Sequence, residues 1–174
     1  MTFEIRSDIT NRSMAIASRA MRRVLRRKRS IIWAIFGWSV FFINALLLIP
    51  FDGESFTLGA STMISLLVEV MLLSVLLFQD QFNGTIACKN ALAGTKEYHF
   101  VFGEDSYTII TEVVTSTFHY ELIDAMAESQ DYMILLMKKR FAQPLDKRTL
   151  TGGTVEKCKR FLEEKTGKTF RRVK

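Results

Sequence analysis

Hydrophobic residues gather in two long runs near the middle of the chain, and each run has the length of a membrane-spanning helix. Residues 31–50 contain no charged side chain, and their only residues outside the hydrophobic class are Gly37, Ser39, Asn44 and Pro50. Twenty residues of α-helix extend about 30 Å, the thickness of the hydrocarbon core of a bilayer. The run lacks the polar stripe that a surface helix of a soluble domain requires. We therefore predict a first transmembrane helix over 31–50.

Residues 58–78 form the second run and hold one charged residue, Glu69, near the middle. A central acidic residue costs about 2.5–3.5 kcal/mol on insertion scales, whereas each Leu, Ile, Val or Phe returns about 0.3–0.6 kcal/mol. About a dozen such residues accompany Glu69. The balance favours insertion and predicts a second transmembrane helix over 58–78.

The distribution of charge predicts the orientation of this hairpin. Residues 1–30 contain nine Lys or Arg against two acidic residues, whereas the short loop 51–57 contains Asp52 and Glu54 but no Lys or Arg. Basic residues stay on the cytoplasmic side of a membrane. We expect a multi-pass protein with both termini in the cytoplasm. A cleaved signal peptide is not expected, because the first run is too long and no small-residue cleavage site follows it.

The basic segment before the first run has helical periodicity. Met14, Ala17 and Met21 recur at three- and four-residue intervals, which predicts an amphipathic helix over 11–29. The basic residues next to the membrane are Arg22, Arg23, Arg26, Arg27, Lys28 and Arg29. These residues either bind the anionic inner leaflet of the bilayer or only set the orientation of the protein in the membrane. Nucleic-acid binding is not expected, because no binding fold accompanies the cluster.

Polar residues within the hydrophobic runs are candidates for a role inside the membrane. Thr62, Ser65 and Glu69 share a helix face, and an antiparallel hairpin is expected to bring Ser39 near the depth of Glu69 and Asn44 near that of Ser65. The favoured interpretation is hydrogen bonding between helices or between copies of the protein. The alternative is a protonatable group in an ion path.

From residue 97 the hydrophobic period changes from that of a helix to that of strands. Residues 79–96 are interpreted as a connector, within which Ile86, Ala87, Asn90 and Leu92 suggest a short helix. Alternating and β-branched patterns then predict strands over 98–102, 107–111, 113–120, 122–128, 132–137 and 140–145. A helix follows, opened by Gly152, Gly153 and Thr154 and ended by Gly167. This order predicts an α+β domain with an antiparallel sheet.

No constellation of residues in the sequence indicates catalysis. There is no nucleophile elbow, phosphate-binding glycine loop or zinc spacing, so we expect no enzyme activity, no cofactor and no metal site. His99 and His119 sit in strand patterns, which favours structural or surface roles. Gly152 to Thr154 at a helix start favours ordinary capping over anion binding. Cys88 and Cys158 are expected to be free thiols.

A second group of basic residues lies in the strand region. Its members are Lys138, Lys139, Arg140, Lys147 and Arg148. The favoured interpretation is a solvated charged rim, and the alternative is a contact with acidic lipid or a protein partner.

Several short stretches resemble the YcxB-like family of bacterial membrane proteins. The stretches are 98–100, 103–105, 118–123, Glu128 before 132–136, 146–150 and 161–165. Two positions depart from the family pattern: Tyr120 stands where Trp is frequent, and Asp146-Lys147 stands where a Pro-Lys pair is frequent. The resemblance implies a C-terminal half barrel related to pleckstrin-homology domains, closed by one C-terminal helix, and a location in the bacterial plasma membrane. It implies no activity.

The sequence thus predicts a membrane α-helical hairpin followed by an α+β domain. The predicted parts are a basic arm (1–30), two transmembrane helices (31–50 and 58–78) joined by an external loop (51–57), a connector (79–96) and a cytoplasmic YcxB-like domain (97–174). The first functional hypothesis is a non-enzymatic adaptor or regulator whose domain binds a protein partner or the membrane surface. The alternative is a self-associating transport or ion-leak component that uses Glu69.

Overall fold

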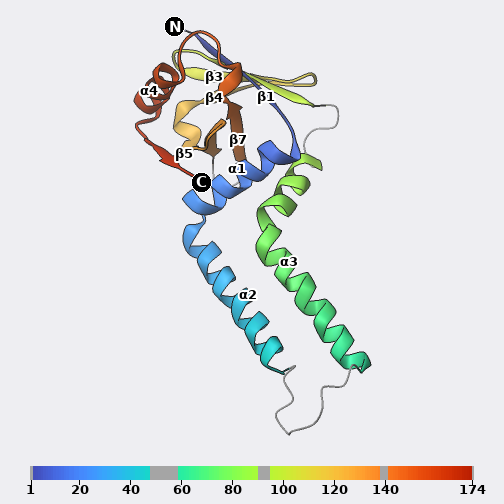
Figure 1. Ribbon diagram of the computed structural model, residues 1–174. Coiled ribbons are helices and arrows are strands. Elements are labelled where there is room, and N and C mark those ends of the chain that lie inside the picture. The colour runs from blue at the N-terminus through green and yellow to red at the C-terminus, as the bar shows by residue number, and fades with distance from the viewer. Residues whose placement is uncertain (1, 48–58, 90–94, 138–140, 174) are drawn as a thin grey trace.

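Two long helices project from one side of a domain of strands (Figure 1). The computed structural model describes residues 2–47, 59–89, 95–137 and 141–173. Strands β1 to β8 and helix α4 together are named the sheet domain below. Helix α1 lies between the sheet domain and the projecting helices α2 and α3 (Figure 1).

The sheet domain contains two four-stranded sheets, named sheet A and sheet B. Sheet A has the order β1-β2-β3-β4, and sheet B has the order β7-β6-β5-β8. Neighbouring strands are antiparallel, except that β8 runs parallel to β5. The strands are β1 (Phe3–Asp8), β2 (Glu97–Phe102), β3 (Ser106–Ile110), β4 (Thr115–His119), β5 (Ile123–Glu128), β6 (Tyr132–Met137), β7 (Phe141–Asp146) and β8 (Phe170–Arg172).

The predicted strands and C-terminal helix are confirmed as β2 to β7 and α4 (Val155–Thr166). Strand β4 begins two residues later than predicted, because Thr111 and Val114 close a turn in which the Thr111 N–H donates to the Val114 carbonyl at 2.9 Å. Thr154 caps α4 by accepting a hydrogen bond from the Lys157 N–H, and Gly167 ends it in the left-handed conformation. Ordinary capping therefore accounts for the Gly-Gly-Thr stretch.

The first strand corrects the prediction of a separate N-terminal arm over 1–30. Strand β1 pairs with β2 along its whole length, from Phe3 opposite Phe102 to Asp8 opposite Glu97. Its side chains alternate between buried and exposed, and Phe3 and Ile5 belong to the main core. The FEIRSD pattern is the local signal of a half-buried strand. It is short and far from its partner in the sequence, so periodicity alone did not connect the two.

The predicted basic helix over 11–29 is two helices, α1 (Asn11–Val24) and the beginning of α2 (Arg27–Leu47). The apolar face of α1 is buried by protein rather than laid on a membrane. Ala17, Ala20 and Met21 pack against Ile134 and Leu136 of strand β6. Helix α1 therefore packs on the sheet domain as one of its covering layers, and its assignment to a separate arm is wrong.

Strand β6 explains why the domain needs α1. All six residues of β6 are buried. Met133, Leu135 and Met137 face a core shared by both sheets and by Cys158 and Leu162 of α4. The alternate residues face α1. A strand buried on both faces is apolar throughout, and it requires a layer on each side.

Helices α2 and α3 (Ala60–Lys89) carry the two hydrophobic runs, and both are long and apolar enough to cross a membrane. Most of their large apolar side chains are exposed. The connector predicted over 79–96 is corrected in part, because α3 continues to Lys89 after non-helical dihedral angles at Phe78. The loop predicted over 51–57 lies outside the described residues.

We predict that Ile5→Ala destabilises the sheet domain by about 2–5 kcal/mol, the usual cost of removing a large buried aliphatic side chain. Ile5 is 0% exposed, whereas Ile110 in strand β3 of the same sheet is 39% exposed and supplies the matched control, Ile110→Ala. Chemical unfolding of the full chain in detergent, followed by near-ultraviolet circular dichroism, measures both variants. Equally small losses of stability in the two variants would show that residues 3–8 are a detached arm.

Candidate functional site

Helix α1 packs closely across the part of α3 that follows Phe78. A Cβ atom on Gly84 would lie 2.5 Å from the backbone nitrogen and 2.7 Å from the Cα of Ala15, so a side chain does not fit between the two backbones. The Cys88 thiol donates to the Ile9 carbonyl oxygen at 3.8 Å. The two helices thus meet backbone to backbone at Gly84, and one turn further along α3 Cys88 contacts the residues that lead into α1.

A buried ion pair fixes the same contact. Asp80 on α3 is 6% exposed. Arg22 donates to its two carboxylate oxygens at 2.9 and 2.5 Å, and Arg19 donates to one of them at 3.3 Å. The hydrogen bond to Asp80 raises the pKa of Arg22 against the opposing effect of burial. Two charge-assisted hydrogen bonds from one planar guanidinium also fix the relative orientation of the helices.

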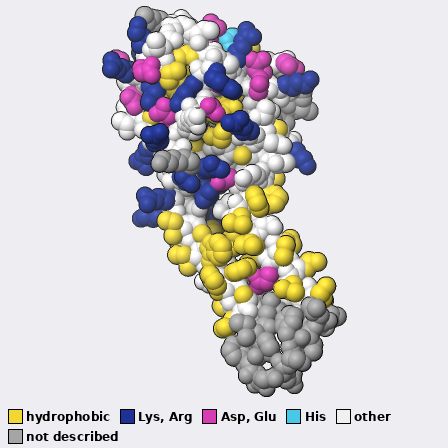
Figure 2. Space-filling view, in the orientation of Figure 1, with side chains coloured by type: hydrophobic (Ala, Val, Ile, Leu, Met, Phe, Trp, Pro, Cys, Tyr) yellow, Lys and Arg dark blue, Asp and Glu magenta, His cyan; other side chains and the backbone are white. Residues whose placement is uncertain are grey.

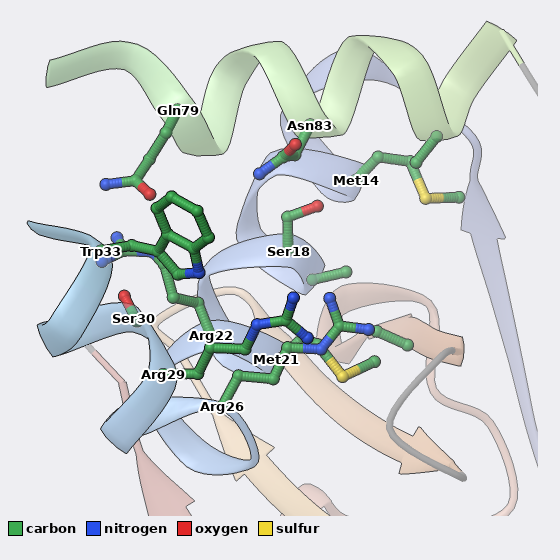
Figure 3. A pocket seen from close by; sticks show the side chains of 13 residues that line it. Met14, Ser18, Met21, Arg22, Arg26, Arg29, Ser30, Trp33, Gln79 and Asn83 are labelled. Atoms are coloured by element: carbon green, nitrogen blue, oxygen red, sulfur yellow. The ribbon is translucent and has the colours of Figure 1, made fainter. Parts of the chain in front are cut away.

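A pocket of about 520 Å³ lies beside this ion pair, where α1, α2 and α3 meet. We name it the arginine pocket. It is lined by Met14, Ala17, Ser18, Met21, Arg22, Arg26, Arg29, Ser30, Trp33, Gln79, Asn83, Ala87 and Ala142. Figure 3 shows the α1 side chains Met14 and Ser18 on one side and Gln79 and Asn83 of α3 on the other.

The arginine pocket is strongly cationic. Arg22, Arg26 and Arg29 follow one another at intervals of four and three residues, on both sides of the turn between α1 and α2, and none of the lining residues is acidic. Basic side chains gather where the sheet domain meets the apolar helices (Figure 2). The geometry suits an anion with an apolar part, because Trp33 and two methionines complete the walls.

The six basic residues predicted to lie beside the membrane divide into two groups. Arg22, Arg26 and Arg29 line the arginine pocket. Arg23, Arg27 and Lys28 are exposed and do not line it. The sequence grouped all six together, whereas in the structure three of them line the pocket and three lie outside it.

Glu69 is buried in the apolar part of α3, at 8% exposed. Neither of its carboxylate oxygens has a hydrogen-bond partner in the part of the chain that the structure describes. Its face-sharing neighbours Thr62 and Ser65 are half-buried. A buried carboxyl without a partner is costly, which makes Glu69 a candidate for an interaction outside the single chain.

The depth predicted for the polar residues of α2 is wrong by about one helical turn. Gly37 lies against Leu76, since a Cβ on Gly37 would come within 2.6 Å of a Leu76 methyl group. Counting outward from this pair places Asn44, rather than Ser39, at the depth of Glu69. The close approach at Gly37 and the anchoring of α3 by α1 set this register, whereas the prediction aligned the hydrophobic runs by their ends.

The hydroxyl and amide groups of α2 bond to their own helix. Ser39 donates to the Ile35 carbonyl at 2.8 Å, and Asn44 donates to the Val40 carbonyl at 2.9 Å. Each bond gives its side chain a partner within α2. Neither bond joins α2 to α3.

Residues 102–162 match the family model described as YcxB-like protein. The chain carries a YcxB-like domain. The match runs from the end of β2 into α4 and leaves out β1, α1 and the two apolar helices. No curated protein and no solved structure matches the chain. The resemblance seen in the sequence is thus confirmed for the YcxB-like domain, and the arginine pocket lies almost wholly outside it.

The second basic group is engaged within the YcxB-like domain where it is described. Lys147 lies 2.7 Å from a Glu128 oxygen, and Arg148 forms two hydrogen bonds to the Asp146 carboxylate. Lys159 binds the other Glu128 oxygen at 2.6 Å. The remaining predicted members, Lys138, Lys139 and Arg140, lie outside the described residues.

The remaining candidate groups have structural surroundings. His99 lies 3.1 Å from Glu4 on the surface of sheet A. Both cysteines are free, as predicted, and burial raises the pKa of the Cys158 thiol to about 12. The described part of the chain holds no group of three or more His, Cys, Asp or Glu residues that could bind a metal ion.

Sequence reasoning missed Asp80 and the arginine pocket. Asp80 appeared as a connector residue, and its partners Arg19 and Arg22 are 61 and 58 positions away in the sequence. The available signal was a single acidic residue directly after a hydrophobic run, in a chain whose basic residues precede the other run. A pocket formed by three separate helices has no signal in local sequence.

We predict that Asp80→Asn weakens the attachment of α1 to α3 by about 1.5–3 kcal/mol, the range for hydrogen bonds to charged groups. Asp131→Asn is the matched control, because Asp131 pairs with Arg12, whose side chain is 75% exposed, and such pairs contribute under about 1 kcal/mol. Hydrogen exchange of the α1 amides reports the difference. Unchanged exchange in Asp80→Asn would show that the ion pair does not hold the helix.

We predict that Asp146 contributes stability that acid removes. The hydrogen bonds from Arg148 lower the pKa of Asp146 below its ordinary value of 3.8, despite partial burial. A lowered native pKa means that the stabilisation is complete above about pH 4 and is lost as the pH falls through the native value. Asp146→Asn should therefore be less stable than wild type at pH 7, and the difference should shrink as the pH falls below about 4, measured by urea midpoints. Glu104→Gln, at an exposed carboxyl, is the control that should follow wild type throughout.

Proposed function

We propose that this protein is a non-enzymatic membrane adaptor or regulator. In this proposal α2 and α3 cross the bacterial plasma membrane as a hairpin, with both termini in the cytoplasm. The sheet domain is then a pleckstrin-homology-like half barrel on the cytoplasmic surface, where it binds a protein partner. Two four-stranded sheets with α4 packed against their shared core support this description of the domain.

Exposure and charge support the membrane placement. The apolar side chains of α2 and α3 face outward along most of the two helices, which is unfavourable in water. The basic residues lie where these helices join the sheet domain (Figure 2). The residues between the two runs include Asp52 and Glu54 and no basic residue, so the positive-inside rule favours a cytoplasmic sheet domain.

The unpaired edge of strand β4 is the observation that carries the adaptor function. In the described chain β4 has β3 as its one neighbour in sheet A. The opposite edge of that sheet is covered, because the N–H and carbonyl of Glu4 in β1 bond to Thr151. An open edge strand offers backbone donors and acceptors to an extended peptide, which adds to the sheet as a further strand.

The hydrogen-bond pattern shows which residues of β4 are available. Thr111 and Val114 form a hydrogen-bonded pair at the turn, and paired positions alternate along an antiparallel ladder. Thr117, opposite Thr108, is then a non-hydrogen-bonded position, and its N–H and carbonyl point away from β3. The two threonine hydroxyls lie 3.3 Å apart, in keeping with the close spacing of such pairs.

A second candidate function rests on Glu69. Its buried carboxylate oxygens without a partner in the described chain favour assembly of several hairpins around this residue, as in a transport or ion-leak component. A neighbouring copy would then supply the missing hydrogen bonds. Reconstituted liposomes test this alternative: it requires pH-dependent flux that Glu69→Gln abolishes, whereas the adaptor keeps its partner in Glu69→Gln.

We predict that Thr117→Pro releases the protein partner while leaving the sheet intact. Proline removes the outward N–H, and edge strands accept proline at positions whose N–H faces solvent. Thr117→Val keeps the N–H and is the matched control. Each full-length protein is purified from native membranes in mild detergent and weighed as an intact assembly.

A stoichiometric second protein is expected with wild type and with Thr117→Val, and is expected to be lost with Thr117→Pro. Retention of the partner by Thr117→Pro would exclude strand addition at β4. A homo-oligomer without a second protein would count against the adaptor and favour the function based on Glu69.

A further inference from the structure

We propose that the arginine pocket and the groove between α2 and α3 form one site for a single anionic glycerophospholipid. The phosphate binds the arginines, and one acyl chain lies in the groove. This inference rests on the proposed function for its membrane setting, and it adds a specific ligand that neither the family match nor the adaptor role assigns.

The head end of the site is cationic, and one of its arginines is already paired with an aspartate of the protein. Arg22 already neutralises Asp80, while Arg26 and Arg29 add two further positive charges to the same walls. Arg29 is exposed. Ser18 and Ser30 add hydroxyl donors. Guanidinium and hydroxyl groups together suit a phosphodiester.

The tail end of the site is a groove of about 310 Å³ between the two helices. Its walls are almost wholly apolar and are formed by Trp33, Ala34, Phe36, Gly37, Val40, Leu72, Val75, Leu76 and Gln79. Gly37 has no side chain, so Leu76 lies directly against the α2 backbone at this point of the groove. A groove of this composition suits a hydrocarbon chain.

The two cavities are adjacent, because Trp33 and Gln79 line both. Arg29 and Trp33 are separated by about one turn of α2, so the walls change from cationic to apolar over about 5.4 Å. The boundary between headgroups and acyl chains of a bilayer shows the same change, and Trp is enriched there. The site therefore matches an amphiphile in both charge and depth.

The composite site selects against other ligands of the same chemistry. A free phosphate would satisfy the arginines and leave the apolar groove empty. A zwitterionic lipid would bring its own cation to walls that already carry three arginines and no acid. An anionic headgroup with a long chain fills both parts, which commits the proposal to a lipid such as phosphatidylglycerol.

The experiment measures lipid binding to the full-length protein in detergent by native mass spectrometry. The probes are dioleoyl phosphatidylglycerol, dioleoyl phosphatidylcholine, dihexanoyl phosphatidylglycerol and inorganic phosphate. We expect one long-chain phosphatidylglycerol per chain and about tenfold weaker binding of phosphatidylcholine, since charge-assisted hydrogen bonds supply the difference.

Three variants locate the two ends of the site. Arg29→Gln is expected to weaken phosphatidylglycerol about tenfold, whereas Lys28→Gln removes an equal charge beside the pocket and is expected to change binding less than about twofold. Ala34→Leu fills the groove, so it should weaken the dioleoyl lipid and leave the dihexanoyl lipid unchanged. None of the three positions belongs to the buried core, and thermal unfolding checks that each variant folds.

Several outcomes would overturn the proposal. Equal losses of lipid affinity in Lys28→Gln and Arg29→Gln would show that the arginines act only as a diffuse surface charge. Competition by inorganic phosphate as effective as that of the dioleoyl lipid would make the site one for free anions. Unchanged dioleoyl binding in Ala34→Leu would exclude the groove. These results are independent of the adaptor function, whose failure is recorded by the Thr117 variants and leaves the lipid affinities untouched.

Discussion

The Asp80 carboxylate, buried between Arg19 and Arg22, holds helix α1 against helix α3 and so decides how the rest of the molecule is assembled. Helix α1 is also the outer layer of sheet B, where it covers one face of the fully buried strand β6. The apolar face of α1 therefore packs on the sheet, and its basic face binds an acidic residue of α3. Detachment of α1 would expose the sheet and remove one wall of the arginine pocket at the same time.

Such an arrangement joins the two halves of the protein without a flexible linker. The close contact of Gly84 with Ala15 leaves no room for sliding between the two helices, and the paired guanidinium hydrogen bonds resist rotation. A change in the tilt of α3 would therefore be transmitted to α1 and to sheet B.

The sequence was a good guide wherever the structural signal is local. The apolar run of β6, the capped helix α4 and the two hydrophobic helices are each specified by residues within a dozen positions, and each was predicted. Three features escaped because their partners are remote. Strand β1 finds β2 about ninety residues away, Asp80 meets Arg19 across 61, and the hairpin register depends on the glycine contact of Gly37 with Leu76. The amphipathic pattern of α1 was recognised, but periodicity cannot distinguish a membrane from a sheet as the surface that covers it.

The placement of the hairpin between β1 and β2 has a consequence for biosynthesis. The first strand of sheet A leaves the ribosome before either apolar helix, and its partner leaves after both. Pairing across such a long connection has to wait until the intervening helices are settled, since closing a long loop is slow. Completion of the sheet thus follows the settling of the two apolar helices. A chain whose helices fail to settle would leave strand β2 without its partner β1 and so expose an edge of sheet A.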